Sequence, residues 1–181
     1  MATLSNMTTK ARLGWILLPA FLGLLFFSFS SVLDKYRVLT NMNNLYQLMT
    51  VVEKVSSLTH ELQLERGLSA GFLISKGQKN ISELPTQRQL TDKRASELKA
   101  FLSHFDSSKF GSLQASLNAA TAEYVKLEAI RGSITRLTAQ PKESFTYYSN
   151  LAGLFVNVVS QAAVNSTDTK LTTQADRKSV V

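Results

Sequence analysis

The sequence has no cysteine among its 181 residues, which excludes disulfide bonds and thiolate chemistry. Its two histidines, His60 and His104, lie far apart in the chain and offer little imidazole for a metal site. No phosphate-binding glycine loop is visible, and serine, aspartate and glutamate form no recognisable acid–base set. The sequence therefore indicates neither an enzyme nor a bound cofactor.

Runs of alternating β-branched residues, which are typical of half-buried strands, are also scarce. Apolar residues instead recur at steps of three and four over most of the chain, as they do in amphipathic helices. A chain of this length is long enough for one domain with a buried core. We therefore expect an all-α protein.

The charge is basic but dilute, with 20 lysines and arginines against 13 aspartates and glutamates. In the first 37 residues, Lys10, Arg12, Lys35 and Arg37 outweigh Asp34, and the rest of the excess is spread thinly. A nucleic-acid interface needs a dense basic stripe, so we expect no nucleic-acid partner. The basic flanks are better explained by a membrane.

An uncharged segment, "LGWILLPAFLGLLFFSFSSVL", extends from Leu13 to Leu33 and is long enough to cross a bilayer as a helix. The basic residues before it favour a cytoplasmic N-terminus at residues 1–12 and place the remaining chain on the other side. A cleaved signal peptide is the alternative, because Ser28 and Ser30 are small enough for a cleavage site.

The periodicity predicts four helices after the apolar segment, and short turns between them are typical of an up-down four-helix bundle over residues 34–165. Residues 166–181 are polar and show no clear apolar stripe, so they are either a flexible tail or the start of a further helix. The expected helices cover residues 34–75, 85–105, 112–138 and 142–164.

The first of these helices ends in "LQLERGLSAGFLISKG", in which an arginine falls on the apolar stripe. Continuing the stripe past Leu62 in steps of three and four leads to Arg66, Ser69 and Leu73. Thr59 lies on the same face and Gln63 lies beside it. The spacing predicts that the guanidinium of Arg66 faces the core.

A buried arginine without a partner is very costly, and two kinds of partner are open. One is a structural carboxylate, from Glu65, Glu61 or Asp92. The other is an exogenous planar oxyanion such as nitrate, nitrite or a carboxylate, which matches the fork of the guanidinium. In that case neutral hydrogen bonds would come from Thr59, Gln63 and Ser69.

Two further arginines lie near this candidate site. Arg131 is one helical step past Leu127 and is a further candidate for contacting the anion. Arg88 and Asp92 are four residues apart on the second helix, where they are expected to pair with each other.

Glycines occupy the interior of the first helix at Gly67 and Gly71, although each costs about 1 kcal/mol relative to alanine there. They suggest a close approach by another backbone. A second apolar row, Leu64, Leu68 and Phe72, lies on the opposite side from Arg66. It predicts that this side is covered by a second subunit or by a fifth helix of the same chain.

The stretches "ELQLERGLSAGFLISKG" and "QRQLTD" resemble the opening of the NIT domain, the nitrate- and nitrite-sensing domain of bacterial chemoreceptors, histidine kinases, cyclic-dinucleotide enzymes and RNA-binding antiterminators. Later in the chain, "AIRGSI" and the pair Tyr147 and Tyr148 are weaker matches. The matching positions of the first two stretches are Leu62, Gln63, Glu65, Arg66, Gly67, Ser69, Ala70, Gly71, Ser75, Gly77, Gln87, Arg88, Thr91 and Asp92.

The resemblance implies an all-helical sensor in which Arg66 contacts nitrate or nitrite. Together with the apolar segment, it predicts a homodimeric bacterial receptor anchored in the inner membrane, with the sensor in the periplasm. The family domain is longer, with a second arginine motif on a later helix, so the resemblance covers about its first half. A membrane-anchored helical module that dimerises without a ligand is the alternative.

Overall fold

The computed structural model describes the backbone of residues 9–178 and the side chains of residues 17–19 and 21–167. Most of the expected cytoplasmic N-terminus, and the last three residues of the polar tail, lie outside the described residues. Within the described part of the chain, all regular structure is helical and there is no strand, which confirms the expected all-α class.

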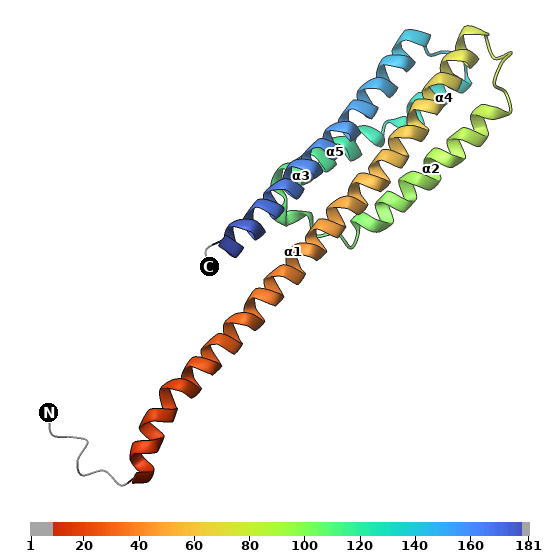
Figure 1. Ribbon diagram of the computed structural model, residues 1–181. Coiled ribbons are helices and arrows are strands. Elements are labelled where there is room, and N and C mark those ends of the chain that lie inside the picture. The colour runs from red at the N-terminus through yellow and green to blue at the C-terminus, as the bar shows by residue number, and fades with distance from the viewer. Residues whose placement is uncertain (1–8, 179–181) are drawn as a thin grey trace. The chain divides into compact units, whose positions relative to one another are not determined.

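Over residues 9–178, five α-helices and one short 3₁₀ helix follow one another (Figure 1). The C-terminal ends of the first two α-helices agree with the expected C-terminal ends to within three residues. The α-helices are α1 (Thr9–Ile74), α2 (Glu83–Leu102), α3 (Gly111–Tyr124), α4 (Leu127–Thr135) and α5 (Pro141–Lys178), with η1 (Ser107–Lys109) before α3.

The chain divides into two compact units, residues 1–43 and 44–181. The first unit contains the apolar segment, whose described large apolar side chains are exposed, among them Phe21, Leu24 and Phe27. Among the described helices, only α1 is long and apolar enough to cross a membrane. The boundaries at residues 33 and 165, and the choice between an anchor and a signal peptide, stay predictions.

One of the expected helices is interrupted, because α3 ends at Tyr124 and α4 begins at Leu127. The expectation of one continuous helix over residues 112–138 was therefore wrong. At the break, the carbonyl of Glu123 accepts hydrogen bonds from the Lys126 amide at 3.1 Å and from the Tyr147 hydroxyl at 3.0 Å. A side chain of α5 thus bonds to a carbonyl at the end of α3.

The last helix is longer than expected, since α5 continues to Lys178 and does not end near residue 164. The expected end of this helix near residue 164 was therefore wrong, and the role of residues 166–181 as a polar tail or as the start of a further segment stays a prediction. No glycine or proline interrupts this segment, and a helix can continue without an apolar stripe once it has begun.

The second unit contains the core, to which the last part of α1 contributes one continuous buried line. This line passes through Leu58, Leu62, Glu65 and Ser69. The expected stripe shares Leu62 and Ser69 with this line but was wrong at Arg66, because Glu65 and not Arg66 is fully buried. Large buried side chains from the other α-helices complete the core, among them Leu98, Leu113, Leu127, Ile134, Tyr148, Leu151 and Phe155.

The row expected opposite Arg66 is partly covered by this chain, since Leu68 and Phe72 pack against the core while Leu64 is exposed. Just beyond α1, the amide of Gly77 donates to the carbonyl of Phe72 at 2.8 Å. Lys76 and Gly77, with φ values of 52° and 81°, follow the end of the helix in the left-handed region, which glycine adopts at little cost.

Gly67 and Gly71 of α1 differ in surroundings, and neither approaches another backbone as expected. A Cβ on Gly67 would meet no atom within 4 Å, whereas a Cβ on Gly71 would lie 2.5 Å from the side-chain nitrogen of Asn80. That nitrogen donates to the carbonyl of Leu68 at 2.9 Å. Gly71 thus leaves room for a side chain that bonds to α1.

We predict opposite effects for alanine at these two positions. Gly67→Ala should raise the free energy of unfolding by about 1 kcal/mol, because alanine is the better helix former. Gly71→Ala should lower it, because Asn80 must move and gives up its bond to Leu68. Urea unfolding of the full chain, followed by circular dichroism, measures both; equal stabilisation would contradict the role given to Asn80.

Candidate functional site

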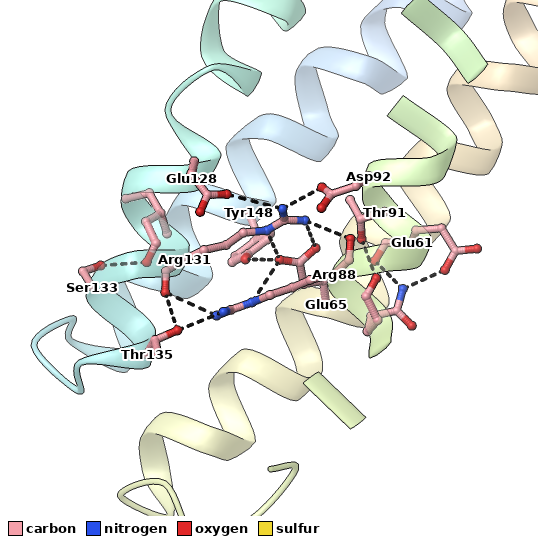
Figure 2. Close-up of polar contacts among 12 residues, drawn as sticks. Glu61, Glu65, Arg88, Thr91, Asp92, Glu128, Arg131, Ser133, Thr135 and Tyr148 are labelled. Carbon is pink, nitrogen blue, oxygen red and sulfur yellow. Dashed lines mark hydrogen bonds and ion pairs between the residues drawn. The ribbon is translucent and has the colours of Figure 1, made fainter. Parts of the chain in front are cut away.

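Glu65 of α1 is a carboxylate with no exposed surface, held by three side-chain hydrogen bonds (Figure 2). The Nε and Nη2 atoms of Arg131 donate to its two oxygens at 2.7 and 2.8 Å. The hydroxyl of Tyr148, on α5, donates to Oε1 at 2.8 Å. A buried carboxylate tolerates desolvation only when its charge and lone pairs are satisfied in this way.

Arg131 of α4 is the buried arginine, with 5% of its surface exposed. Its Nη1 donates to Oδ1 of Asp92, on α2, at 2.6 Å, and lies 3.7 Å from the exposed carboxylate of Glu128. Burial alone would lower the pKa of Arg131, but the hydrogen bonds and charges of Glu65 and Asp92 together outweigh burial and raise it. All three guanidinium nitrogens of Arg131 therefore donate to carboxylates of this same chain.

Arg88 lies beside this cluster and does not pair with Asp92 as expected. Its Nη1 donates to Thr135 Oγ1 at 2.9 Å and its Nη2 to the carbonyl of Arg131 at 3.3 Å. Its Nε lies 3.8 Å from Glu65. The expectation failed because Asp92 binds Arg131, while Arg88 joins α2 to α4.

Three tyrosines near the cluster stay protonated well above neutral pH. Burial raises the pKa of Tyr148, and the neighbouring Glu65 carboxylate raises it further. Burial likewise raises the pKa of Tyr147, and it raises the pKa of Tyr124 to about 12, with a contribution from Asp92. Tyr148 therefore remains a hydrogen-bond donor to Glu65 over the physiological range.

Arg66 lies outside this cluster, half-buried at the edge of the core and against the first turns of α5. Its Nη1 donates to Ser149 Oγ at 3.1 Å, and its guanidinium carbon lies 4.6 Å from the centre of the Phe145 ring. Among the described side chains, no carboxylate lies within 4.0 Å of its nitrogens. The expected structural partners, Glu61, Glu65 and Asp92, all bind elsewhere.

The three neutral candidates are distributed differently around α1. Thr59 is buried and its hydroxyl donates to the carbonyl of Val55 at 2.8 Å, so its proton is already used within the helix. Gln63 is exposed. Ser69 is fully buried, and its oxygen has no hydrogen-bond partner within the described part of the structure. Among the described contacts, none joins these three side chains to Arg66.

The sequence matches the family model for nitrate and nitrite sensing, NIT, over residues 57–176. This is well over half of the chain. The chain belongs to the NIT family. The comparison with curated proteins found no significant match.

A solved structure that resembles this NIT chain is described as "Structure of the NasR transcription antiterminator". The two share 23% sequence identity with a TM-score of 0.68, and the match covers 79% of this chain. The chain spans only 38% of the length of that structure. At this identity the likeness concerns the fold.

The contacts of this NIT chain include residues that the sequence did not reveal. Half of the surface of Phe145 is exposed, and its ring lies against Arg66. Ser149 stands four residues further along α5, so the two side chains share one face. The four-residue spacing is visible in the sequence, but it indicates a site only once Arg66 of α1 is known to be the partner. The anion contacts of Arg66, Ser69, Thr59, Gln63 and Arg131 stay predictions.

Removing the Glu65 carboxylate should destabilise the fold strongly. Glu65→Ala leaves Arg131 buried with one carboxylate fewer, and breaking a buried pair costs about 3–5 kcal/mol. Glu128→Ala is the matched control, because that carboxylate is exposed and its loss should change stability little. Urea unfolding measures both, and similar effects from the two variants would contradict a special role for Glu65.

Stability should also fall at alkaline pH. The folded-state pKa of Tyr148 lies above the ordinary value of 10.0, so its stabilising contribution is full below that pH and is lost as pH rises through the folded-state value. We expect the free energy of unfolding to decline above pH 10, and to decline less steeply in Tyr148→Phe. Urea unfolding at a series of pH values tests this; identical slopes would argue against it.

Proposed function

We propose that this chain is the sensing part of a membrane-anchored bacterial receptor and that it binds nitrate or nitrite through Arg66. The family membership supports the ligand. One observation supports the residue: Arg66 is the half-buried arginine near the core whose charge no carboxylate among the described side chains neutralises. A small anion would supply the missing charge.

The buried cluster supports this choice by contrast. The fold satisfies Arg131 with Glu65 and Asp92, so a nitrate ion at Arg131 would have to displace a carboxylate from a desolvated pair. Arg66 has only a neutral hydroxyl and an aromatic ring beside it. An anion that binds Arg66 therefore competes with no internal charge, and Arg66 takes the main role in the proposal.

The proposed mechanism is a shift between two packings of an up-down helical bundle. An anion at Arg66 would lie close to both α1 and α5, because Arg66 belongs to α1 and its partners belong to α5. The packing that offers the better anion contacts gains population when the anion binds. We propose that α1 transmits this change, because the same helix contains the apolar segment.

The proposed location is the bacterial inner membrane, with the N-terminus in the cytoplasm, the helical domain in the periplasm and two copies forming the receptor. The single long apolar helix supports an anchor. The dilute positive charge supports a small anion as partner in place of nucleic acid. The output, as in a chemoreceptor, would be signal transduction across the membrane.

The alternative is a ligand-free dimerisation module, which would be favoured if Glu65 or Asp92 neutralised Arg66. Both carboxylates instead bind Arg131. The alternative therefore lacks the contact that would support it, and the sensor is the better reading.

We predict that Arg66→Ala abolishes stabilisation by nitrate. At nitrate concentrations 100-fold above the dissociation constant, the wild-type chain should gain about 2.7 kcal/mol of stability. Arg66→Ala should keep its helicity and gain nothing, because the cation that binds the anion is missing. Thermal unfolding of the full chain in detergent, followed by circular dichroism, measures both.

Arg136→Ala is the matched control, since Arg136 is an exposed arginine at the C-terminal end of α4 and removing it changes the net charge equally. Nitrate should stabilise this variant as it stabilises the wild type. The proposed function fails if nitrate and nitrite leave the wild-type unfolding temperature unchanged, or if Arg66→Ala responds as the wild type does.

A further inference from the structure

The contacts of Arg66 with α5 fix the guanidinium at two places. Its Nη1 donates to Ser149 Oγ at 3.1 Å, and the guanidinium carbon lies 4.6 Å from the centre of the Phe145 ring. The ring attracts the cation to its face, and the hydroxyl holds one end of the fork. One contact therefore restrains the plane of the guanidinium, and the other restrains its rotation within that plane.

The hydrogen bonds of Ser149 make its role one-directional. Its hydroxyl proton is donated to the carbonyl of Phe145 at 2.7 Å, so towards Arg66 the oxygen can only accept. Phe145 and Ser149 are four residues apart, and this bond links them within one turn of α5. The serine oxygen is thus held where it accepts from Nη1.

This arrangement leaves one edge of the guanidinium open. Nε and Nη2 of Arg66 have no hydrogen-bond or ion-pair partner among the described residues, whereas Nη1 is engaged. The Nε–Nη2 edge presents two parallel N–H groups, the geometry that matches two oxygens of a planar oxyanion. The same edge of Arg131 binds the two oxygens of Glu65, which shows how this edge receives a carboxylate in this fold.

We propose that Phe145 and Ser149 are positioning residues that orient Arg66 so that its Nε–Nη2 edge receives a planar two-oxygen anion. This inference rests on the proposed function, because it assigns the geometry of the same site. The residues act through Arg66 and need not touch the anion. Their effect is preorganisation, since an arginine already held in its binding orientation loses less freedom when the ligand arrives.

A purely structural role does not account for these two side chains. Phe145 leaves half of its surface exposed, although a ring that served the core would be buried, as that of Tyr148 is. Ser149 is only half-buried and is not needed to satisfy a buried charge. The ring and hydroxyl therefore contribute little to the core, and both contact the same arginine.

The test compares a planar anion with a spherical one on the full chain in detergent micelles, by isothermal titration with nitrate and with bromide. Ser149→Ala should weaken nitrate binding about two- to tenfold, the range for one hydrogen bond. Phe145→Leu should weaken it about two- to fivefold, the range for an exposed cation–π contact. Bromide has no oxygen edge to match, so its affinity should stay nearly constant in both variants.

Conservative variants and a neighbour provide the controls. Ser149→Thr keeps the accepting hydroxyl and Phe145→Tyr keeps the aromatic face, so both should retain the wild-type preference for nitrate over bromide. Asn150→Ala, at the exposed position next to Ser149, should change neither affinity. Circular dichroism of each variant confirms that it is folded.

The outcomes separate the two proposals. If Arg66→Ala loses nitrate binding while Ser149→Ala and Phe145→Leu keep the wild-type nitrate affinity, the positioning role is overturned and the sensor function stands. An equal loss of nitrate and bromide affinity in the two variants would also overturn it, since that result indicates a loss of charge or fold. If nitrate does not bind the wild-type chain, the proposed function falls, and with it the role of the edge.

Discussion

A single buried carboxylate organises the helical domain. Glu65 accepts hydrogen bonds from Arg131 and Tyr148, and Arg131 in turn binds Asp92, so one connected set of contacts joins α1, α2, α4 and α5. Glu65 and Arg131 would each be costly to bury alone and are tolerated because they are paired, with Asp92 as a half-exposed further partner. The short helix α4 offers only a few apolar residues to the core, and Arg131 attaches it to α1 through Glu65 and to α2 through Asp92.

Arg66 differs from Arg131 because none of the carboxylates in that set pairs with it. The carboxylates near it are committed to Arg131, to Gln87 or to solvent-facing partners, and the residues that contact Arg66 are a hydroxyl and an aromatic ring. The fold therefore pairs only one of two adjacent charged residues of α1 with an opposite charge. Glu65 is neutralised inside the fold, and Arg66 keeps its charge at the edge of the core.

Much of the fold could be predicted from periodicity, and the failures have identifiable causes. The expected stripe was wrong at Arg66 because steps of three and four can be joined in more than one order, and from Leu62 a step of three leads to Glu65 while a step of four leads to Arg66. Neither glycine nor proline marks the break between Tyr124 and Leu127, so the pattern alone gave one helix. The extension of α5 past residue 164 was missed because that part has no apolar stripe.

The site was less predictable, because its decisive contacts are between distant residues. Arg66 could be singled out on α1, but Phe145 and Ser149 are 79 and 83 residues away and carry no signal until α5 lies beside α1. The pairing of Arg131 with Glu65 and Asp92 likewise depends on how α4, α1 and α2 meet. Residue identity indicated which side chains carry charge, and only the packing determined which charges meet.

Consecutive residues of α5 bind consecutive residues of α1: Tyr148 contacts Glu65, and Ser149 contacts Arg66. The first contact is dry and the second is at the surface, yet both lie at one level of the helix pair. Sliding either helix by one residue, about 1.5 Å along its axis, would break both contacts together. The register of α5 against α1 is thus fixed at a single place, where a change at Arg66 is coupled to the buried contact of Glu65.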